Sequence, residues 1–285
     1  MIVNSIINVI IISALLIASY TDIKRREVPD WLSYGLIFVG LGLRLIYSLA
    51  VWEFSYIIYG LAGFGIMLAF ALVMFYAGQW GGGDSKVLMG LGALIGLEFS
   101  AGSFLVSFFL NSLIVGAFYG LVWSILAAFA NFNKFKKEVI IINKRFANLK
   151  KALIGAVALL ILILIFSPDI VLKIMAGSAA LVFSFTFYLM IFVKAVENAC
   201  MLKYVKPSEL TEGDWIANDI LVGGKKIAGP RDLGVSKKQI KQLAEFYKKK
   251  KVRKVLIKTG IPFVPAFLAA YIITLFIGNI ALVFL

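Results

Sequence analysis

Two aspartates stand at the places where membrane-length apolar segments meet polar residues. Asp22 follows the first apolar segment, within "YTDIKRREVPD", and Asp84 precedes a later one, within "QWGGGDSKVLMG". Two carboxyl groups that share a proton can hydrolyse a peptide bond. The ionised carboxylate takes a proton from the attacking water, and the protonated one hydrogen-bonds the peptide carbonyl. Asp22 and Asp84 are therefore candidate catalytic residues, provided that the fold brings them together.

The residues around these aspartates support this interpretation but also leave simpler ones open. Gly81, Gly82 and Gly83 have no side chains, so that an extended peptide backbone can approach Asp84 closely. Taken alone, residues 81–84 equally fit a glycine-rich turn with an aspartate that caps a helix. Asp22 alone equally fits a solvated boundary residue, and two neighbouring acids, Glu27 and Asp30, compete with it for a catalytic role.

The composition indicates a polytopic membrane protein. Of 285 residues, 61% are hydrophobic and 15% are charged, and the mean hydropathy is +0.95. Several apolar stretches exceed the roughly 18 residues that cross a bilayer. The chain has no histidine and a single cysteine, which excludes histidine-based catalysis, disulfides within the chain and Cys/His zinc sites. We predict neither a metal nor a cofactor.

Hydropathy predicts an all-α protein with about eight transmembrane helices and a small α+β cytoplasmic domain inserted before the last helix. The predicted spans are about 2–19, 31–50, 56–77, 86–99, 103–130, 152–166, 170–193 and 261–285. We divide the chain into a catalytic transmembrane core (1–130), a basic amphipathic surface helix (131–151), a transmembrane helix pair (152–193), the cytoplasmic domain (194–260) and the C-terminal transmembrane helix (261–285). Within the cytoplasmic domain, Gly223–Gly224 indicates a hairpin and Ser236 a helix cap.

The distribution of charge predicts the orientation in the membrane. The formal net charge is +14, and the cations lie in the loops after the first, third, fifth and seventh spans. The opposite loops contain no Lys or Arg, so that the basic loops should face the cytoplasm and both termini the other side. Asp22 and Asp84 then lie at the same depth, on the cytoplasmic face. Anionic lipid, rather than nucleic acid, is the expected partner of the basic surface.

Both aspartate segments resemble a known family. "GGGDSKVLMGLGALIG" resembles the GxGD motif of membrane aspartic proteases, in the form that prepilin peptidases show, with a lysine two positions later and a glycine-spaced apolar helix. "ASYTDIKRREVPDWLS" resembles the first catalytic motif of the same family. The matching positions are Asp22, Lys24 to Arg26, Pro29, Gly81, Gly83, Asp84, Lys86, Gly90, Gly92 and Gly96. Because the chain lacks a cysteine-rich segment, it resembles the archaeal type IV prepilin and preflagellin peptidases.

This resemblance implies a substrate and a reaction. Members of the family remove the basic leader peptide from type IV pilin-like or archaellin precursors at the cytoplasmic face. Asp22 and Asp84 would be catalytic, Gly81 to Gly83 and Lys86 would form the active-site loop, and Glu27 and Asp30 are possible contacts of the leader. An alternative is a GxGD protease of the presenilin or signal-peptide-peptidase type, and a more distant one is a proton-coupled transporter. The sequence leaves the oligomeric state open.

Overall fold

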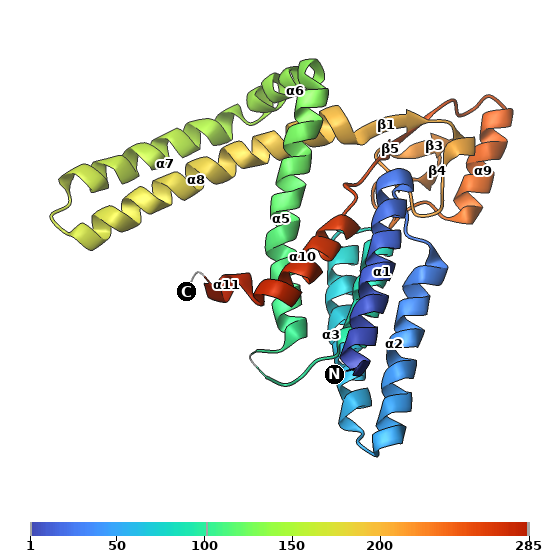
Figure 1. The fold of residues 1–285 in the computed structure, drawn as a ribbon. Helices are drawn as coiled ribbons and strands as arrows, with labels where there is room; N and C mark the ends of the chain where they lie inside the picture. Colours follow the sequence, from blue (N-terminus) through green and yellow to red (C-terminus); the bar gives the residue numbers. More distant parts are fainter. Residues whose placement is uncertain (1, 101, 284–285) are drawn as a thin grey trace. The chain divides into compact units, whose positions relative to one another are not determined.

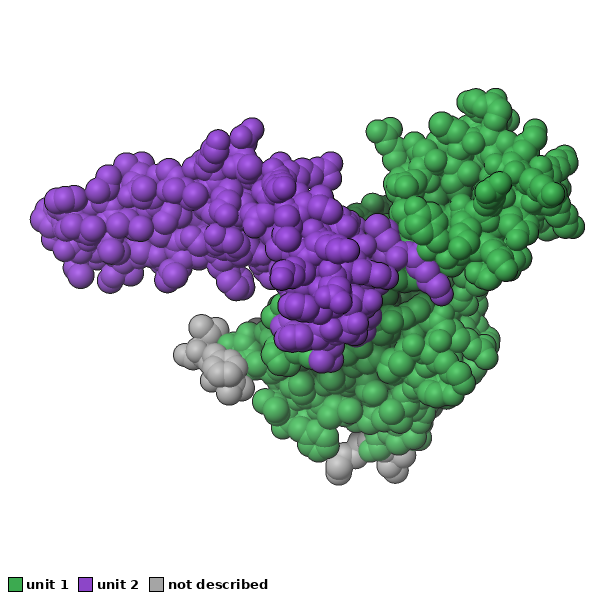
Figure 2. All heavy atoms as spheres, turned by 90° about the horizontal axis from the view of Figure 1, so that it is seen from above, with its two compact units in different colours: residues 1–122, 204–285 green, residues 123–203 purple. Residues whose placement is uncertain are grey.

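The computed structural model describes residues 2–100 and 102–283 of the chain. The described part is mostly helical, with a small sheet region late in the sequence (Figure 1). It divides into two compact units, which Figure 2 colours separately. The first unit contains residues 1–122 and 204–285, and the second contains residues 123–203. Each unit is described by itself below.

The first unit contains four helices that precede the division of the chain, and α4 is central among them. These are α1 (Ile2–Arg25), α2 (Asp30–Val51), α3 (Ser55–Tyr76) and α4 (Gly82–Ile95), and α5 (Phe104–Ala130) continues into the second unit. α4 packs against both α2 and α3. A Cβ atom at Gly92 of α4 would overlap the main-chain oxygen of Gly63 of α3, and one at Gly40 of α2 would lie 2.9 Å from the Leu94 nitrogen. Small residues therefore let these backbones pack in direct contact.

Arg44 of α2 binds the C-terminal end of α4. The last carbonyl groups of a helix have no partner within the helix itself. The Arg44 guanidinium donates to the carbonyl oxygens of Ala93, Leu94 and Ile95, and to that of Tyr56 at the start of α3. An arginine inside an apolar helix is thereby satisfied by main-chain oxygens, and it joins three helices at one point.

The last long helix of the first unit, α10 (Val264–Ile277), packs along α1 and is followed by the short α11 (Ile280–Val283). Polar side chains hold it inside an otherwise apolar environment. The Tyr271 hydroxyl donates to the Asn8 side-chain oxygen of α1 over 2.8 Å. The Asn111 amide of α5 donates to the Thr274 hydroxyl over 2.9 Å, and the Asn111 oxygen accepts from the Ile280 main chain. Such interhelical bonds fix the position of a helix in an apolar surrounding.

Before α10 the chain forms the small α+β region that the sequence predicts. Its elements are β1 (Leu202–Val205), a 3-10 turn (Pro207–Glu209), β2 (Trp215–Ile216), β3 (Ile220–Val222), β4 (Lys225–Ala228), α9 (Lys237–Lys248) and β5 (Val255–Lys258). One sheet has the order β1-β5-β2, and β3 and β4 form an antiparallel hairpin. Gly223 and Gly224 turn the hairpin with φ of +61° and +76°, which glycine adopts without strain. Ile216, Leu243 and Val255 belong to its separate apolar core.

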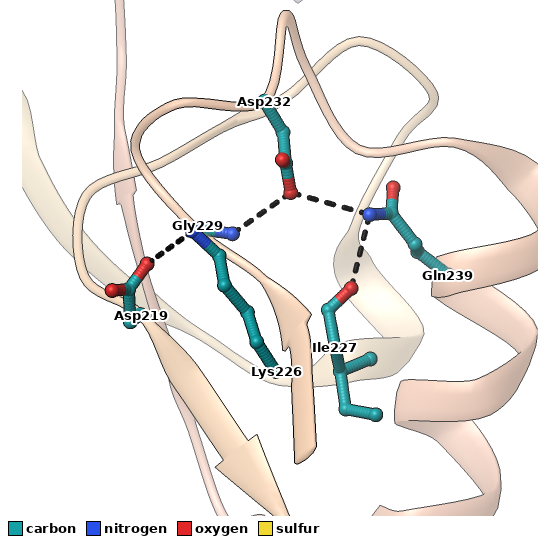
Figure 3. A network of polar contacts seen from close by, with 6 residues as sticks. All are labelled: Asp219, Lys226, Ile227, Gly229, Asp232 and Gln239. Atoms are coloured by element: carbon teal, nitrogen blue, oxygen red, sulfur yellow. Dashed lines mark hydrogen bonds and ion pairs between the residues drawn. The ribbon is translucent and has the colours of Figure 1, made fainter.

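A polar network joins the β3–β4 hairpin to α9 (Figure 3). The Asp232 carboxylate accepts from the Gly229 main chain over 3.0 Å and from the Gln239 amide over 3.2 Å. The Gln239 amide also donates to the Ile227 oxygen over 3.0 Å. Ser236 caps α9 by accepting from the Gln239 main chain, which confirms the predicted cap.

The second unit is mostly helical. After the end of α5 it contains α6 (Phe132–Arg145), α7 (Ala147–Phe166), α8 (Ile170–Val196) and a π-helical turn (Glu197–Met201). α7 and α8 form a hairpin, and Asp169 caps α8 by accepting from the Val171 nitrogen over 2.8 Å. Ile142 of α6 is buried with Phe187 and Ile191 of α8. The predicted basic helix 131–151 is thus divided between α6 and the first turn of α7.

The helix lengths confirm a multi-pass membrane protein. Among the described residues, six helices are long and apolar enough to cross a membrane: α1, α2, α3, α5, α7 and α8 with its following turn. The other two predicted spans, 86–99 and 261–285, form α4 and α10, which have 14 residues each. They end at Gly96 (φ +72°) and Gly278 (φ +80°). At about 1.5 Å per residue such helices are shorter than the roughly 30 Å hydrocarbon core.

The contact between α3 and α4 generates a first prediction. Gly63→Ala places a methyl group against the α4 backbone, and we expect it to lower the free energy of unfolding by about 1–3 kcal/mol. Gly65→Ala, two residues further along α3, meets nothing within 4 Å and is the matched control. Thermal denaturation of both variants in the same detergent measures the difference. Equal loss of stability in the two variants would contradict the direct backbone packing.

Candidate active site

Asp22 lies in the last turn of α1 and is buried, with 6% of its surface exposed. The helix continues beyond the predicted end of the span at 19 as far as Arg25, and Arg26 ends it in the left-handed region with φ of 60°. The carboxylate accepts a hydrogen bond from the Val264 nitrogen, at the start of α10, over 3.0 Å. Asp22 is therefore held inside the protein, and it is not the solvated boundary residue that its sequence neighbours permit.

Asp84 lies in the first turn of α4, directly after the glycine-rich loop. Gly81 is extended (φ −71°, ψ 164°) and precedes the helix, and its nitrogen donates to the Asp84 carboxylate over 3.2 Å. A Cβ atom at Gly83 would lie 3.3 Å from the Val28 side chain, which places the α1–α2 loop against the start of α4. The glycines thus let Asp84, on one segment, lie beside the loop that follows Asp22.

The structure brings the two predicted catalytic residues to one place. α1 packs against α4, and the carboxyl groups of Asp22 and Asp84 lie close enough to interact electrostatically. Two carboxyl groups in such proximity oppose each other's ionisation. This is the arrangement that aspartic proteolysis requires.

Lys86 does not point freely into solution. Its ammonium group lies 2.6 Å from the Asp30 carboxylate and 5.0 Å from the centre of the Tyr34 ring, both on α2. The pair joins the N-terminal part of α4 to the first turn of α2. Lys86 lies two residues after Asp84. Asp30, one of the two predicted leader contacts, is thereby engaged with a cation of the chain itself.

Glu27, the other predicted leader contact, is exposed in the loop between α1 and α2. Its neighbour from the late part of the chain is Asp214. Burial raises the pKa of the Asp214 carboxyl, the Thr211 main chain acts in the opposite direction, and the charge of Glu27 adds to the increase. Glu27 therefore lies near another carboxyl group.

The structure adds a group of residues that the sequence reasoning missed. Trp80, next to the glycine-rich loop, is buried, and its ring lies 5.4 Å from that of Phe263. The Arg26 guanidinium donates to the Gly260 oxygen over 3.0 Å. A Cβ atom at Gly78 would lie 2.9 Å from the Trp215 ring. In the sequence, the two prolines in "IPFVPAF" indicate where an apolar helix begins. They do not indicate which residues this helix contacts.

These observations agree with the comparison of the sequence with known proteins. Residues 9–121 match the type IV leader peptidase family. This region includes Asp22, Asp84 and the glycine-rich loop, so the predicted resemblance is confirmed. It does not include α6 to α8 or the late α+β region. No solved structure matches the chain significantly.

Individual relatives give the same result. The chain is 43% identical over 81 residues to a preflagellin peptidase of Methanococcus voltae, and 40% identical to that of Methanocaldococcus jannaschii over the same length. It is 37% identical over 81 residues to the preflagellin peptidase of Methanococcus maripaludis. Each match covers 28% of this chain and 34–35% of the relative. The chain thus spans about a third of the length of the curated relatives that it matches.

The Lys86–Asp30 pair yields a second prediction. The Asp30 side chain is 70% exposed, so that solvent screens the attraction and the coupling should stay below about 1 kcal/mol. A double-mutant cycle of Lys86→Met and Asp30→Asn, followed by thermal denaturation, measures this coupling. A coupling above about 3 kcal/mol, the range of buried pairs, would show that the pair is shielded from water.

Proposed function

We propose that this protein is a membrane-embedded aspartic endopeptidase that removes the basic leader peptide from type IV pilin-like or archaellin precursors. The observation that carries the proposal is the meeting of Asp22 and Asp84 at the ends of two adjacent helices. Both residues lie in the region that matches the type IV leader peptidase family. The relatives named preflagellin peptidase support the same class of substrate.

The two carboxyl groups are sufficient for the reaction. The ionised one removes a proton from a water molecule as its oxygen attacks the carbonyl carbon of the scissile peptide. The protonated one donates a hydrogen bond to the carbonyl oxygen, on which negative charge develops. When the tetrahedral intermediate collapses, the C–N bond breaks and the leaving amine takes up a proton. The carboxyl pair again holds one proton at the end of the cycle.

The position of the aspartates along their helices supports cleavage at the membrane surface. Asp22 lies in the last turn of a membrane-length helix, and Asp84 lies in the first turn of α4. Presenilin-type proteases place both acids within their spans, and transporters usually place theirs near the midplane. With the basic loops on the cytoplasmic side, we infer that the site faces the cytoplasm. The precursor's apolar helix would remain in the bilayer while its leader reaches the aspartates.

The surroundings of the site suggest how a basic leader is received. Glu27 is exposed at the loop beside Asp22, whereas Asp30 already binds Lys86. We infer that Glu27 is the better contact for a leader cation. We also infer that the basic residues of α6 and those of the late α+β region bind anionic lipid headgroups, since each basic residue near such a surface contributes about 1 kcal/mol. Nucleic acid has no part in this proposal.

The decisive test is cleavage of a basic-leader pilin precursor in membranes. Asp22→Asn and Asp84→Asn keep the size of the side chain and remove its ionisable carboxyl. We expect each to lower the cleavage rate at least about 100-fold, the lower range for loss of an acid or base. Immunoblots for unchanged abundance and Asp219→Asn, a matched exposed change in the late α+β region, are the controls. Cleavage at the wild-type rate by either aspartate variant would disprove the catalytic pair.

A separate prediction concerns the leader. Because Glu27 is exposed and carries no assigned part in bond cleavage, Glu27→Gln should raise KM for a basic leader about 2- to 5-fold, as expected for an exposed ion pair, and leave kcat unchanged. A precursor whose leader lysines are replaced by glutamine should show no difference between wild type and Glu27→Gln. An equal effect on both precursors would argue against a contact between Glu27 and the leader cations.

A further inference from the structure

The carboxylate of Asp22 is bound by the opposite end of the chain. The Val264 nitrogen donates to it over 3.0 Å, across 242 positions of the sequence, and Val264 is completely buried. The main-chain N–H of Phe263 also interacts with this carboxylate. Val264 is the first residue of α10 and Phe263 directly precedes it, both outside the region that matches the peptidase family. The position of the Asp22 carboxylate thus depends on a part of the chain that lies outside the matching region.

The segment 260–264 is held in place on several sides. Its first residue accepts from the Arg26 guanidinium through the Gly260 oxygen. The Phe263 ring packs against Trp80, and a Cβ atom at Gly116 would overlap it. Behind the segment, Tyr271 fixes α10 to α1 through its hydrogen bond. The Val264 N–H group is therefore presented to Asp22 by a segment that is packed and hydrogen-bonded to its neighbours.

The two carboxyl groups differ in what they accept. Asp84 lies in the first turn of α4, whereas Asp22 lies in the last turn of α1 and faces the first residue of α10, so that the dipoles of α1 and α10 act on it in opposite directions. Asp84 accepts a single, longer bond from its own loop, through Gly81. Asp22 is buried, which opposes its ionisation, but it accepts the bond from Val264 and lies near the Phe263 main chain and the charge of Arg26. Hydrogen bonds and cations favour the ionised form of a carboxyl group.

We propose that the main-chain amide of Val264 positions Asp22 as the ionised member of the catalytic pair, so that the start of α10 is part of the active site. Asp22 is then the base that takes the proton of the attacking water, and Asp84 is the protonated partner that binds the substrate carbonyl. Val264 is a positioning residue, because it acts through Asp22. The inference rests on the proposed function and assigns different roles to the two aspartates.

A pair of substitutions at one position separates the amide from the side chain. Val264→Pro removes the N–H group, and proline is tolerated at the first position of a helix, which Val264 occupies in α10. Val264→Ala shortens the side chain but keeps the N–H group. The pH dependence of kcat/KM for the basic-leader precursor, measured in membranes, is the readout. The titratable and charged groups that face Asp22 are Arg26, Asp84 and Tyr119, and they are the same in both variants.

We expect Val264→Pro to lower kcat about 10- to 100-fold and to move the acidic limb of the profile upward by about 1 pH unit, since a carboxylate that has lost a donor ionises less readily. In Val264→Ala, the acidic limb of the kcat/KM profile should stay at the same pH as in wild type. Identical profiles for the two variants would overturn the inference. If wild type itself does not cut the precursor, the proposed function fails, and the inference falls with it. Phe263→Leu, which loosens the packing but keeps both amides, should lower stability without moving the limb.

A second comparison applies if Val264→Pro does not accumulate in membranes. Arg26→Gln removes the cation near Asp22, whereas Arg26→Lys keeps it. We expect the acidic limb to move upward in Arg26→Gln alone. An unmoved limb would show that Asp22 is not the ionised member of the pair.

Discussion

The direct backbone packing of α4 against α2 and α3 is the constraint on which the site depends. A helix of 14 residues is too short to cross a bilayer, so that its depth must be set by its neighbours. Gly40, Gly63 and Gly92 set the distance between the backbones, since any larger side chain would overlap them. Arg44 binds the carbonyl oxygens at one end, and the Lys86–Asp30 pair joins the other end to α2. These contacts fix the depth of Asp84, in the first turn of α4, and its orientation.

The residues that bear the chemistry could be predicted from the sequence because their signals are local. An aspartate after an apolar segment, another after three glycines, and a proline that starts the next helix are all visible in short stretches. The hairpin at Gly223–Gly224 and the cap at Ser236 are equally local, and both are confirmed. Asp22 and Asp84 meet as expected, while their catalytic roles, the domain boundaries and the membrane orientation stay predictions.

The features that the sequence did not indicate arise from contacts between distant parts of the chain. Hydropathy assigned 261–285 to one span, but Gly278 ends α10 at Ile277 because its φ is +80°. The presence of an arginine within an apolar helix does not reveal its partners. The carbonyl groups of α4 that Arg44 binds lie about 50 positions further along the sequence. The bond from Val264 to Asp22 is more distant still and involves a main-chain N–H, which every residue except proline possesses. No pattern of residue types marks such a donor.

The bond between Asp22 and Val264 also has a consequence for the synthesis of the protein. The ribosome synthesises α1 to α4 first. The Asp22 carboxylate is separated from its donor, the Val264 nitrogen, by 242 positions. At about 5–20 residues per second, roughly 10–50 s pass between the two. During that interval both aspartates are already in the membrane, but the segment that orients Asp22 does not yet exist. An unfinished chain therefore lacks the hydrogen bond that joins Asp22 to the last long helix, and this contact forms only after almost all of the protein has been synthesised.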